Sequence, residues 1–258
     1  MTEETVDAKY TFCRSGGDRL GWVRIPGAIV KFFLLLLTKR EWRGMRHVPL
    51  QGPAIFVWNH YSDFDPLPVC HYVYNAGRHP RFLLKHSLIR IPVAGPIIHA
   101  TGQIPVYRGR RDAADSLREA IAVLENGGSV IIAPEGSVTK EPDRWPMRGK
   151  TGVARLALET GAPVVPIAQW GSLQIHDRHR KPKFRIGRRK LVTVAARPPV
   201  DLDRWREAEI NRDNLVAVSD HIMNALRDGV AELRGREAPP LFDLRSRQQP
   251  REESEPTD

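Results

Sequence analysis

The sequence predicts an α/β fold: one domain with a mixed, mostly parallel sheet flanked by helices and an apolar or amphipathic N-terminal helix. From Gly52 onward, short apolar runs alternate with stretches whose apolar residues recur at helical spacing. Strands separated by helices are typical of a sheet with helices on its faces. The 258 residues suffice for one substantial core. The two cysteines, Cys13 and Cys70, argue against a disulfide scaffold or a zinc cluster.

The expected strands and helices follow from the pattern of apolar residues and from the capping and glycine residues at their ends. Strands are expected at Ala54–Trp58, Arg81–Leu84, Gln103–Tyr107, Ser129–Ala133, Val164–Ala168 and Leu191–Ala195. Three helices are expected. The first begins at a cap at Asp112 and ends at Gly127 and Gly128, and the second covers Val153–Thr160 and ends at Gly161. The third runs from about Asn211 to Val230.

Three segments are expected along the chain. Residues 1–41 hold the apolar run Ile25–Leu37, which Lys31 interrupts and which is shorter than the about 20 residues that span a bilayer. This run is either a helix lying in a membrane interface or a buried N-terminal helix, and the sequence leaves both open. Residues 42–236 form the main domain. The tail from Glu237 is rich in Pro, Arg and Glu and is expected to be disordered.

The charge balance indicates anionic partners. Forty Lys and Arg against 30 Asp and Glu give a net charge of +10, which favours nucleic acid, an anionic membrane, or phosphorylated and CoA-like ligands. Eight Lys and Arg lie between Arg178 and Lys190, either as a solvated loop or as a patch for head groups. The absence of a helix-turn-helix, zinc or RNA-binding motif argues against nucleic acid. The acidic, polar start does not fit a secretory signal, so we expect the protein at the cytoplasmic face of the cell membrane.

A histidine directly after the first strand of the main domain is the sharpest candidate for chemistry. His60 can accept a proton at neutral pH, and a carboxylate on its second ring nitrogen would fix its tautomer. On a continuous helix His60 and Asp65 would point about 140° apart. Because Pro66 disfavours helical geometry at Asp65, we expect His60 in a loop and Asp65 at a helix entrance. The alternative is a structural histidine with Asp65 as a helix N-cap.

Three further motifs hold polar groups at strand ends or in basic turns. Glu135, in Pro134-Glu135-Gly136-Ser137, follows a strand and could orient a substrate hydroxyl, although the motif is also a plain turn. Arg108 lies in a basic turn that could grip a phosphate. Lys150 lies in Gly149-Lys150-Thr151-Gly152, half of a phosphate loop whose earlier glycine is replaced by Arg144. A nucleotide hydrolase is therefore excluded, and the lack of Gly-x-Ser-x-Gly argues against a serine hydrolase.

These motifs occur in one order along the chain. They are Asn59-His60 followed after four intervening residues by Asp65, Gly102 to Arg108, Pro134 to Ser137, and Ala162 to Ala168. Together they resemble the four blocks of the glycerolipid acyltransferase family that includes 1-acyl-sn-glycerol-3-phosphate acyltransferases. The resemblance covers roughly residues 42 to 198.

The resemblance implies transfer of an acyl chain from acyl-CoA or acyl carrier protein to a lysophospholipid hydroxyl at a membrane surface, in phospholipid biosynthesis. His60 is then the general base, Asp65 orients it, and no metal or other cofactor is needed. Substrate contacts are expected from Arg108, which would bind the acceptor phosphate, and from Asn59, Glu135, Gly136, Ser137 and Lys150.

Two blocks depart from the family pattern. Val138 stands where the third block usually has arginine, and Pro105 where the second is usually aromatic. A lost guanidinium removes charge-assisted hydrogen bonds worth about 1.5–3 kcal/mol, for which Lys140 or Lys150 could compensate. The acceptor could instead be glycerol-3-phosphate, another lysolipid or monoacylglycerol. A non-catalytic lipid- or membrane-binding protein is the other alternative.

Overall fold

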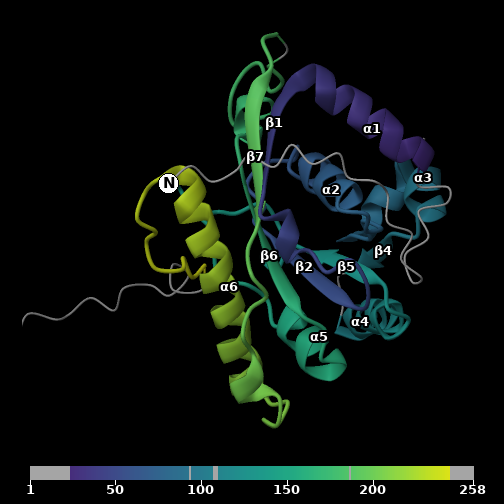
Figure 1. Cartoon of the computed structure of the whole chain (residues 1–258), viewed down its shortest axis with the longest axis vertical. Coiled ribbons are helices and arrows are strands. Elements are labelled where there is room, and N and C mark those ends of the chain that lie inside the picture. Colours follow the sequence, from purple (N-terminus) through teal and green to yellow (C-terminus); the bar gives the residue numbers. More distant parts are fainter. Residues whose placement is uncertain (1–23, 93, 107–109, 186, 245–258) are drawn as a thin grey trace, which may run out of the picture.

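The computed structural model describes residues 24–92, 94–106, 110–185 and 187–244 of the chain. Its centre is a five-stranded sheet with the strand order β1-β7-β6-β2-β5 (Figure 1). The strands are β1 (Thr38–Arg43), β2 (Ala54–Trp58), β5 (Ser129–Ile132), β6 (Val164–Trp170) and β7 (Lys190–Ala196). A second, parallel pair consists of β3 (Leu83–Lys85) and β4 (Ile104–Val106).

The sheet is mixed, which confirms the predicted α/β class. β6, β2 and β5 run parallel, β7 is antiparallel to β6, and β1 is parallel to β7. A bridge between Phe82 and Ile131 links the β3 side of the small pair to β5. The six apolar strands that the sequence predicts are all present, with ends that differ by at most two residues.

Strand β1 is absent from the sequence prediction. The predicted boundary between the N-terminal segment and the main domain, between residues 41 and 42, falls inside this strand. Its sequence, TKREWR, carries four charged residues. Such a sequence is tolerated because β1 is an edge strand, with only Thr38 buried and the other residues partly or fully exposed. Residues 38–41 therefore belong to the sheet.

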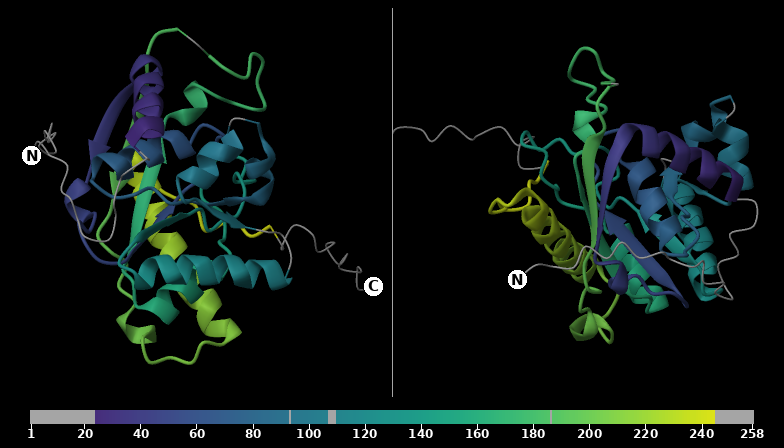
Figure 2. Two further views of the ribbon diagram at one scale, coloured as in Figure 1. Left: turned by 90° about the vertical axis from the view of Figure 1, so that its right-hand side faces the viewer. Right: turned by 45° about the horizontal axis from the view of Figure 1, so that its top comes forward.

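Helices cover both faces of the sheet (Figures 1 and 2). They are α1 (Arg24–Leu37), α2 (Pro66–Asn75), α3 (Ala94–Ala100), α4 (Arg110–Glu125), α5 (Gly152–Thr160) and α6 (Arg212–Arg234). Short 3-10 helices lie at η2 (Met45–His47), η3 (His86–Arg90), η4 (Ser172–Gln174) and η5 (Asp203–Trp205). Helix α4 begins two residues before the predicted cap. Helix α6 begins as predicted, because Asn211 accepts a hydrogen bond from the Asn214 amide and caps it.

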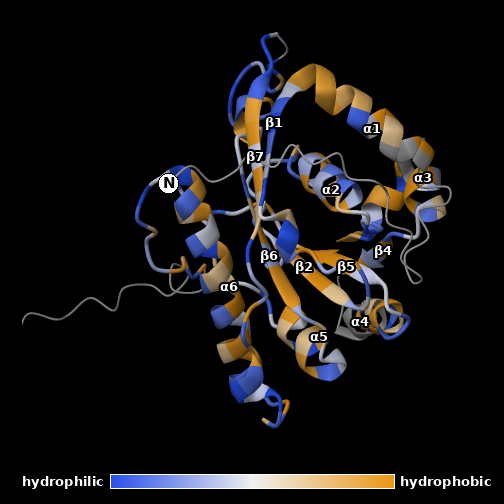
Figure 3. Ribbon diagram, viewed as in Figure 1, coloured by the Kyte–Doolittle hydropathy of each residue, from blue (hydrophilic) through white to orange (hydrophobic). Residues whose placement is uncertain are grey.

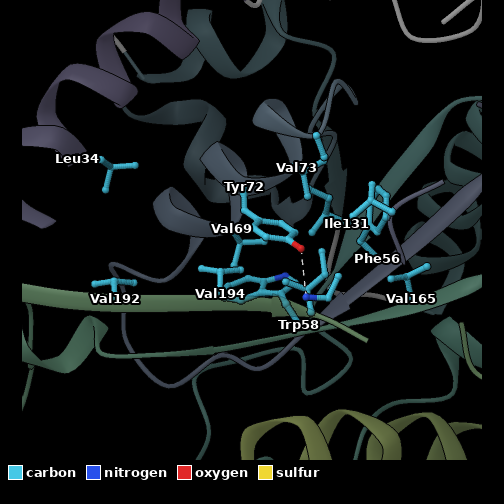
Figure 4. Packing of buried hydrophobic residues seen from close by; sticks show 14 of the residues in the cluster. Leu34, Phe56, Trp58, Val69, Tyr72, Val73, Ile131, Val165, Val192 and Val194 are labelled. Carbon is cyan, nitrogen blue, oxygen red and sulfur yellow. Dashed lines mark hydrogen bonds between the residues drawn. The ribbon is translucent and has the colours of Figure 1, made fainter. Parts of the chain in front are cut away.

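Alternating residues of β2 build two separate cores. Phe56 and Trp58 face α1 and α2 together with Leu34 and Tyr72, whereas Ile55 and Val57 of β2 face α4, α5 and α6. Figure 4 shows the first core, in which the Tyr72 ring of α2 lies over the sheet. The Tyr72 hydroxyl donates to the Arg43 carbonyl (2.7 Å) and accepts from the Ala196 amide (3.2 Å). These bonds tie α2 to the ends of β1 and β7.

Helix α1 combines features of the two alternatives that the sequence leaves open. Leu34 is buried at 1 % exposure, and its neighbour Leu37 packs against the same core. The opposite side of the helix leaves five large apolar side chains 53–61 % exposed, namely Ile25, Ile29, Phe32, Phe33 and Leu36. A wholly buried helix is therefore excluded, and Figure 3 shows the largely apolar character of α1. Among the described residues, none of the helices has both the length and the apolar character to cross a bilayer.

The chain after α6 packs back on the domain as far as the structure describes it. Phe242 forms a β-bridge with Met147, and its carbonyl accepts from the Arg148 amide (2.9 Å). The Arg148 guanidinium pairs with Asp243 (2.9 Å). The predicted start of a disordered tail at Glu237 is therefore too early, because backbone and ion-pair contacts hold the segment as far as Asp243.

Candidate functional site

His60 and Glu135 meet at one edge of the sheet. His60 follows β2 and Glu135 follows β5, and these neighbouring strands run parallel, with Val57 opposite Ile132. The carboxyl ends of parallel strands lie at the same edge, where open α/β sheets hold their ligands. The His60 amide donates to Glu135 Oε1 (3.0 Å). The structure thus brings together two residues that the sequence singled out 75 positions apart.

Asp65 lies directly behind the His60 ring. Its Oδ2 is 3.3 Å from His60 Nδ1 and accepts from the amides of Tyr61 and Ser62, both at 2.6 Å. Asp65 is fully buried. The loop closes on this one carboxylate oxygen, which explains how residues five apart can meet.

The conformation at Asp65 differs from the sequence prediction. Its φ of −50° and ψ of −40° are helical, although Pro66 follows. The three contacts of Oδ2 hold this disfavoured conformation. Asp65 occupies the N-cap position of α2, as the sequence predicts, but within the described part of the chain its side chain makes no capping hydrogen bond to the helix and binds the His60 loop instead.

The orientation of His60 suits a general base. A carboxylate at Nδ1 favours the tautomer with its proton on Nδ1, which leaves the Nε2 lone pair free to accept a proton. The His60 side chain is 18 % exposed, so a substrate can reach the ring. The Trp58 ring packs against it with centroids 4.7 Å apart, and this contact limits rotation of the imidazole.

Glu135 braces the loop from beneath. It is 3 % exposed, and its second oxygen accepts from the Met147 amide (3.1 Å). Burial raises the pKa of Glu135 to about 8, an effect that outweighs the lowering by the backbone hydrogen bonds from His60 and Met147. The sequence prediction of a direct substrate contact is not met by this arrangement, because both carboxyl oxygens are engaged inside the fold.

The backbone of His60 is held from both directions. Its carbonyl accepts from the Thr139 amide (2.6 Å), while its amide is bound by Glu135. The Thr139 hydroxyl in turn donates to the Trp145 carbonyl (2.8 Å). Sequence reasoning missed Thr139 and Met147, because they act through backbone amides, which leave no signal in residue identity.

Lys150 lies over the turn of the third block. Gly136 has φ +68°, and a Cβ there would lie 2.8 Å from Lys150 Cε and 2.9 Å from Nζ. The Lys150 amide donates to the Pro134 carbonyl (2.8 Å), and its side chain is exposed. The Ser137 hydroxyl donates to the Val138 carbonyl (3.2 Å). The Lys150 side chain therefore places a positive charge beside the third block, in which Val138 occupies the position that is usually arginine.

Asn59 and Arg108 are placed differently from the other predicted residues. Asn59 is 1 % exposed. Its side-chain Nδ2 donates to the Gln169 backbone carbonyl (3.1 Å), and its Oδ1 accepts from the Gln169 backbone amide (2.8 Å). These bonds fasten the start of the loop to β6, so the side chain does not face a substrate as predicted. Arg108 lies outside the described residues.

Comparison with known proteins decides the family. A family model described as Acyltransferase matches residues 39–170, which is more than half of the chain. The chain belongs to this acyltransferase family. The match includes the His60–Asp65 loop and the Pro134–Ser137 turn. It confirms that the sequence motifs identify the chain as an acyltransferase of this family.

The relatives agree on one kind of enzyme. The 1-acyl-sn-glycerol-3-phosphate acyltransferase of Borreliella burgdorferi is 32% identical over 81% of this chain and 80% of its own length. A chloroplastic enzyme of the same name from Brassica napus is 30% identical over 53% of this chain, and that match spans 39% of the plant protein. The protein is thus an acyltransferase that resembles 1-acylglycerol-3-phosphate O-acyltransferases, a family of phospholipid biosynthesis.

A solved structure supports the fold. The crystal structure of the 1-acyl-sn-glycerophosphate (LPA) acyltransferase PlsC from Thermotoga maritima superimposes with a TM-score of 0.64 at 25% identity. The similarity covers 84% of this chain and 81% of that chain. The α/β sheet and its helices therefore follow the architecture of that enzyme.

Proposed function

We propose that this acyltransferase transfers a fatty acyl chain from a thioester, acyl-CoA or acyl carrier protein, to the free hydroxyl of a lysophospholipid such as 1-acyl-glycerol-3-phosphate. The observation that carries the proposal is the His60–Asp65 pair, with Nδ1 on a buried carboxylate and Nε2 left for substrate. Both the family and the names of its relatives support the reaction class.

In the proposed reaction His60 moves one proton. Nε2 takes the proton from the acceptor hydroxyl as its oxygen bonds to the thioester carbonyl carbon. The carbon–sulfur bond then breaks, and the imidazolium returns the proton to the leaving sulfur, so that an ester and a free thiol result. Asp65 stabilises the imidazolium between these steps.

The remaining residues of the site hold the reactants or the loop. Lys150 supplies the positive charge beside Gly136 that an acceptor phosphate needs, in the region where arginine is missing. Arg108 is proposed as a second phosphate ligand on the strength of the sequence motif alone. Gly136 and Ser137 border the acceptor, whereas Asn59 and Glu135 position the loop.

The protein is proposed to work at a membrane surface. The apolar side of α1 is exposed, and the basic hairpin, residues 176–190, carries eight Lys and Arg. Exposed apolar side chains next to cations favour binding to an anionic bilayer. Because the cytoplasmic leaflet is the anionic one, we assign the enzyme to that face as a peripheral protein.

The first experiment incubates wild type and His60→Ala with palmitoyl-CoA or palmitoyl carrier protein and a panel of acceptors. The panel holds glycerol-3-phosphate, lysophosphatidic acid, other lysolipids and monoacylglycerol, with lipid products read by mass spectrometry. We expect a His60-dependent product with lysophosphatidic acid. A product with another acceptor alone would correct the substrate. No product with either donor would leave the second candidate, a lipid-binding protein, which the exposed face of α1 also suits.

A further inference from the structure

The last residue of α6, Arg234, contacts the rings of two tryptophans. Its guanidinium carbon lies 3.9 Å from the centroid of the Trp145 ring and 4.4 Å from that of the Trp170 ring. Both distances are inside the range of about 6 Å over which an aromatic ring attracts a cation. The Arg234 Nη1 also donates to the Asp143 carbonyl (3.0 Å). The guanidinium therefore joins the end of β6, which is Trp170, to the loop that holds Asp143 and Trp145.

The Trp170 ring stacks on a residue of the proposed catalytic loop. The Tyr61 and Trp170 rings have centroids 4.9 Å apart and 24° between their planes. Tyr61 directly follows His60 and is 2 % exposed, and its amide is one of the two that donate to Asp65 Oδ2 (2.6 Å). Because the position of a packed ring constrains the backbone of the same residue, the stack holds the amide that binds the Asp65 carboxylate.

Trp145 supports the same loop through a different contact. Its carbonyl accepts from the Thr139 hydroxyl (2.8 Å), and the Thr139 amide donates to the His60 carbonyl (2.6 Å). Trp145 is 5 % exposed, and its own amide donates to the Glu141 carboxylate (2.9 Å). Arg234 thus contacts two rings, and each of them leads to the backbone of the loop that carries His60.

Arg234 lies on an element that none of the sequence motifs includes. Helix α6 packs along β6, on the other side of the sheet from α1 and α2 (Figure 1). Gly235 ends the helix in the left-handed conformation, and a cation in the last turn suits the helix dipole. Residue 234 lies beyond residues 39–170, which the family model matches. The contacts of Arg234 indicate support of the loop, not contact with a substrate.

We infer that Arg234 is a positioning residue for the proposed catalytic pair. The inference rests on the proposed function and adds a residue on which its rate depends. The guanidinium holds the Trp170 ring, this ring holds Tyr61, and the Tyr61 amide keeps Asp65 against the imidazole. Loss of the cation loosens the stack, so the carboxylate and the imidazole spend less time in the reactive geometry. The effect falls on kcat, because neither substrate binds through this route.

Hydrogen exchange tests the support of the loop without using activity. Arg234→Met keeps the length of the side chain but removes the charge. Arg204→Met is the matched control, because the Arg204 guanidinium lies 3.6 Å over the ring of Trp205, which belongs to the second core. In Arg234→Met we expect the Tyr61 and Ser62 amides to exchange about tenfold faster, with the amides of β2 unchanged. Unchanged exchange in the loop, equal exchange in both variants, or faster exchange in β2 as well would overturn the inference.

Kinetics with the same variants provides the second test. We expect Arg234→Met to lower kcat about tenfold for lysophosphatidic acid and palmitoyl-CoA, because a small displacement of catalytic groups has effects of this size. KM for both substrates should match Arg204→Met. Trp170→Leu removes the middle ring, so the double variant should lower kcat by less than the product of the two single effects. Effects that multiply, or a raised KM with unchanged kcat, would contradict the positioning role.

The two proposals fail in different ways. Loss of transfer in wild type with every donor and acceptor would refute the proposed function, whereas hydrogen exchange still reports whether Arg234 supports the loop. Transfer that depends on His60 but has the same kcat in wild type and Arg234→Met would refute the inference alone. If Arg234→Met does not fold, as judged by circular dichroism, Arg234→Gln takes its place, since its amide can still donate to the Asp143 carbonyl.

Discussion

The His60–Asp65 loop and the surface formed by α1 and the basic hairpin are built on opposite principles. In the loop, the fully buried Asp65 accepts from two amides and contacts the imidazole, and the His60 backbone is bound at both its amide and its carbonyl. On the surface, Phe32 and Phe33 of α1 are more than half exposed, and the hairpin carries closely spaced charges.

The difference follows from what each region binds. Proton transfer needs groups held within hydrogen-bond distance, so each contact in the loop is specific and hard to replace. The free energy of binding to a bilayer is the sum of many weak apolar and electrostatic contacts, so the loss of one contact changes it little. Single substitutions should therefore have large effects in the loop and small ones on the surface.

His60→Ala should give the largest effect. Removing the general base should lower kcat by about 100- to 10,000-fold, while unfolding and vesicle binding stay as in wild type. Thiol release from palmitoyl-CoA in the presence of lysophosphatidic acid measures the loss. Retained turnover would show that the loop is structural and would remove the basis of the comparison.

Asp65→Asn should lower kcat by about 100-fold and leave residual activity. The amide oxygen can still accept from the Tyr61 and Ser62 amides, but it carries no charge to stabilise the imidazolium. The pH dependence of kcat in wild type and variant measures this effect. Normal turnover with an unchanged pH profile would contradict the orienting role.

Lys150→Met should raise the acceptor KM by about 10- to 100-fold, because a charge-assisted contact to phosphate is worth about 1.5–3 kcal/mol. The donor KM should not change. Lys140→Met is the matched control, since Lys140 is also exposed near the third block. Equal acceptor KM values for the two variants would place the phosphate elsewhere.

Glu135→Gln should change how stability depends on pH. The pKa of Glu135 rises from 4.5 to about 8 on folding, so between these values the folded state binds more protons than the unfolded state. Wild-type stability contributed by this group therefore falls as pH rises from 5 to 8, and the variant lacks this fall. Urea unfolding of both proteins at pH 5, 6.5 and 8 measures it; parallel trends would contradict the raised pKa.

Lys183→Ala should give the smallest effect. One lysine near an anionic surface contributes about 1 kcal/mol, so the partition coefficient on phosphatidylglycerol vesicles should fall about fivefold while kcat on a soluble, short-chain acceptor is unchanged. Sedimentation with vesicles at low and high salt measures the partition. A loss of kcat with this acceptor would mean that the hairpin belongs to the chemical site, and the two regions would no longer be separable.

Much of the site was predictable because its chemistry resides in residue identity. A histidine after an apolar strand, a carboxylate before Pro66 and a glutamate at a second strand end were all visible in the sequence, as were the apolar strands. The glycine at position 161 ended α5 as predicted, because its φ of +64° suits glycine. Edge strand β1 was not predictable, since its charged sequence has no strand periodicity.

By itself the sequence determined the α/β class, the six apolar strands in their order, the helices α4, α5 and α6, and the identity of the proposed base and its carboxylate. Local patterns and residue chemistry decide these features. Only the tertiary structure decided that Asp65 turns back to bind the loop, that Asn59 and Glu135 brace it from inside, and that Lys150 lies over Gly136. These depend on which backbone amides and side chains lie within hydrogen-bond distance after folding, and residues far apart in the chain meet only when the sheet and its helices pack.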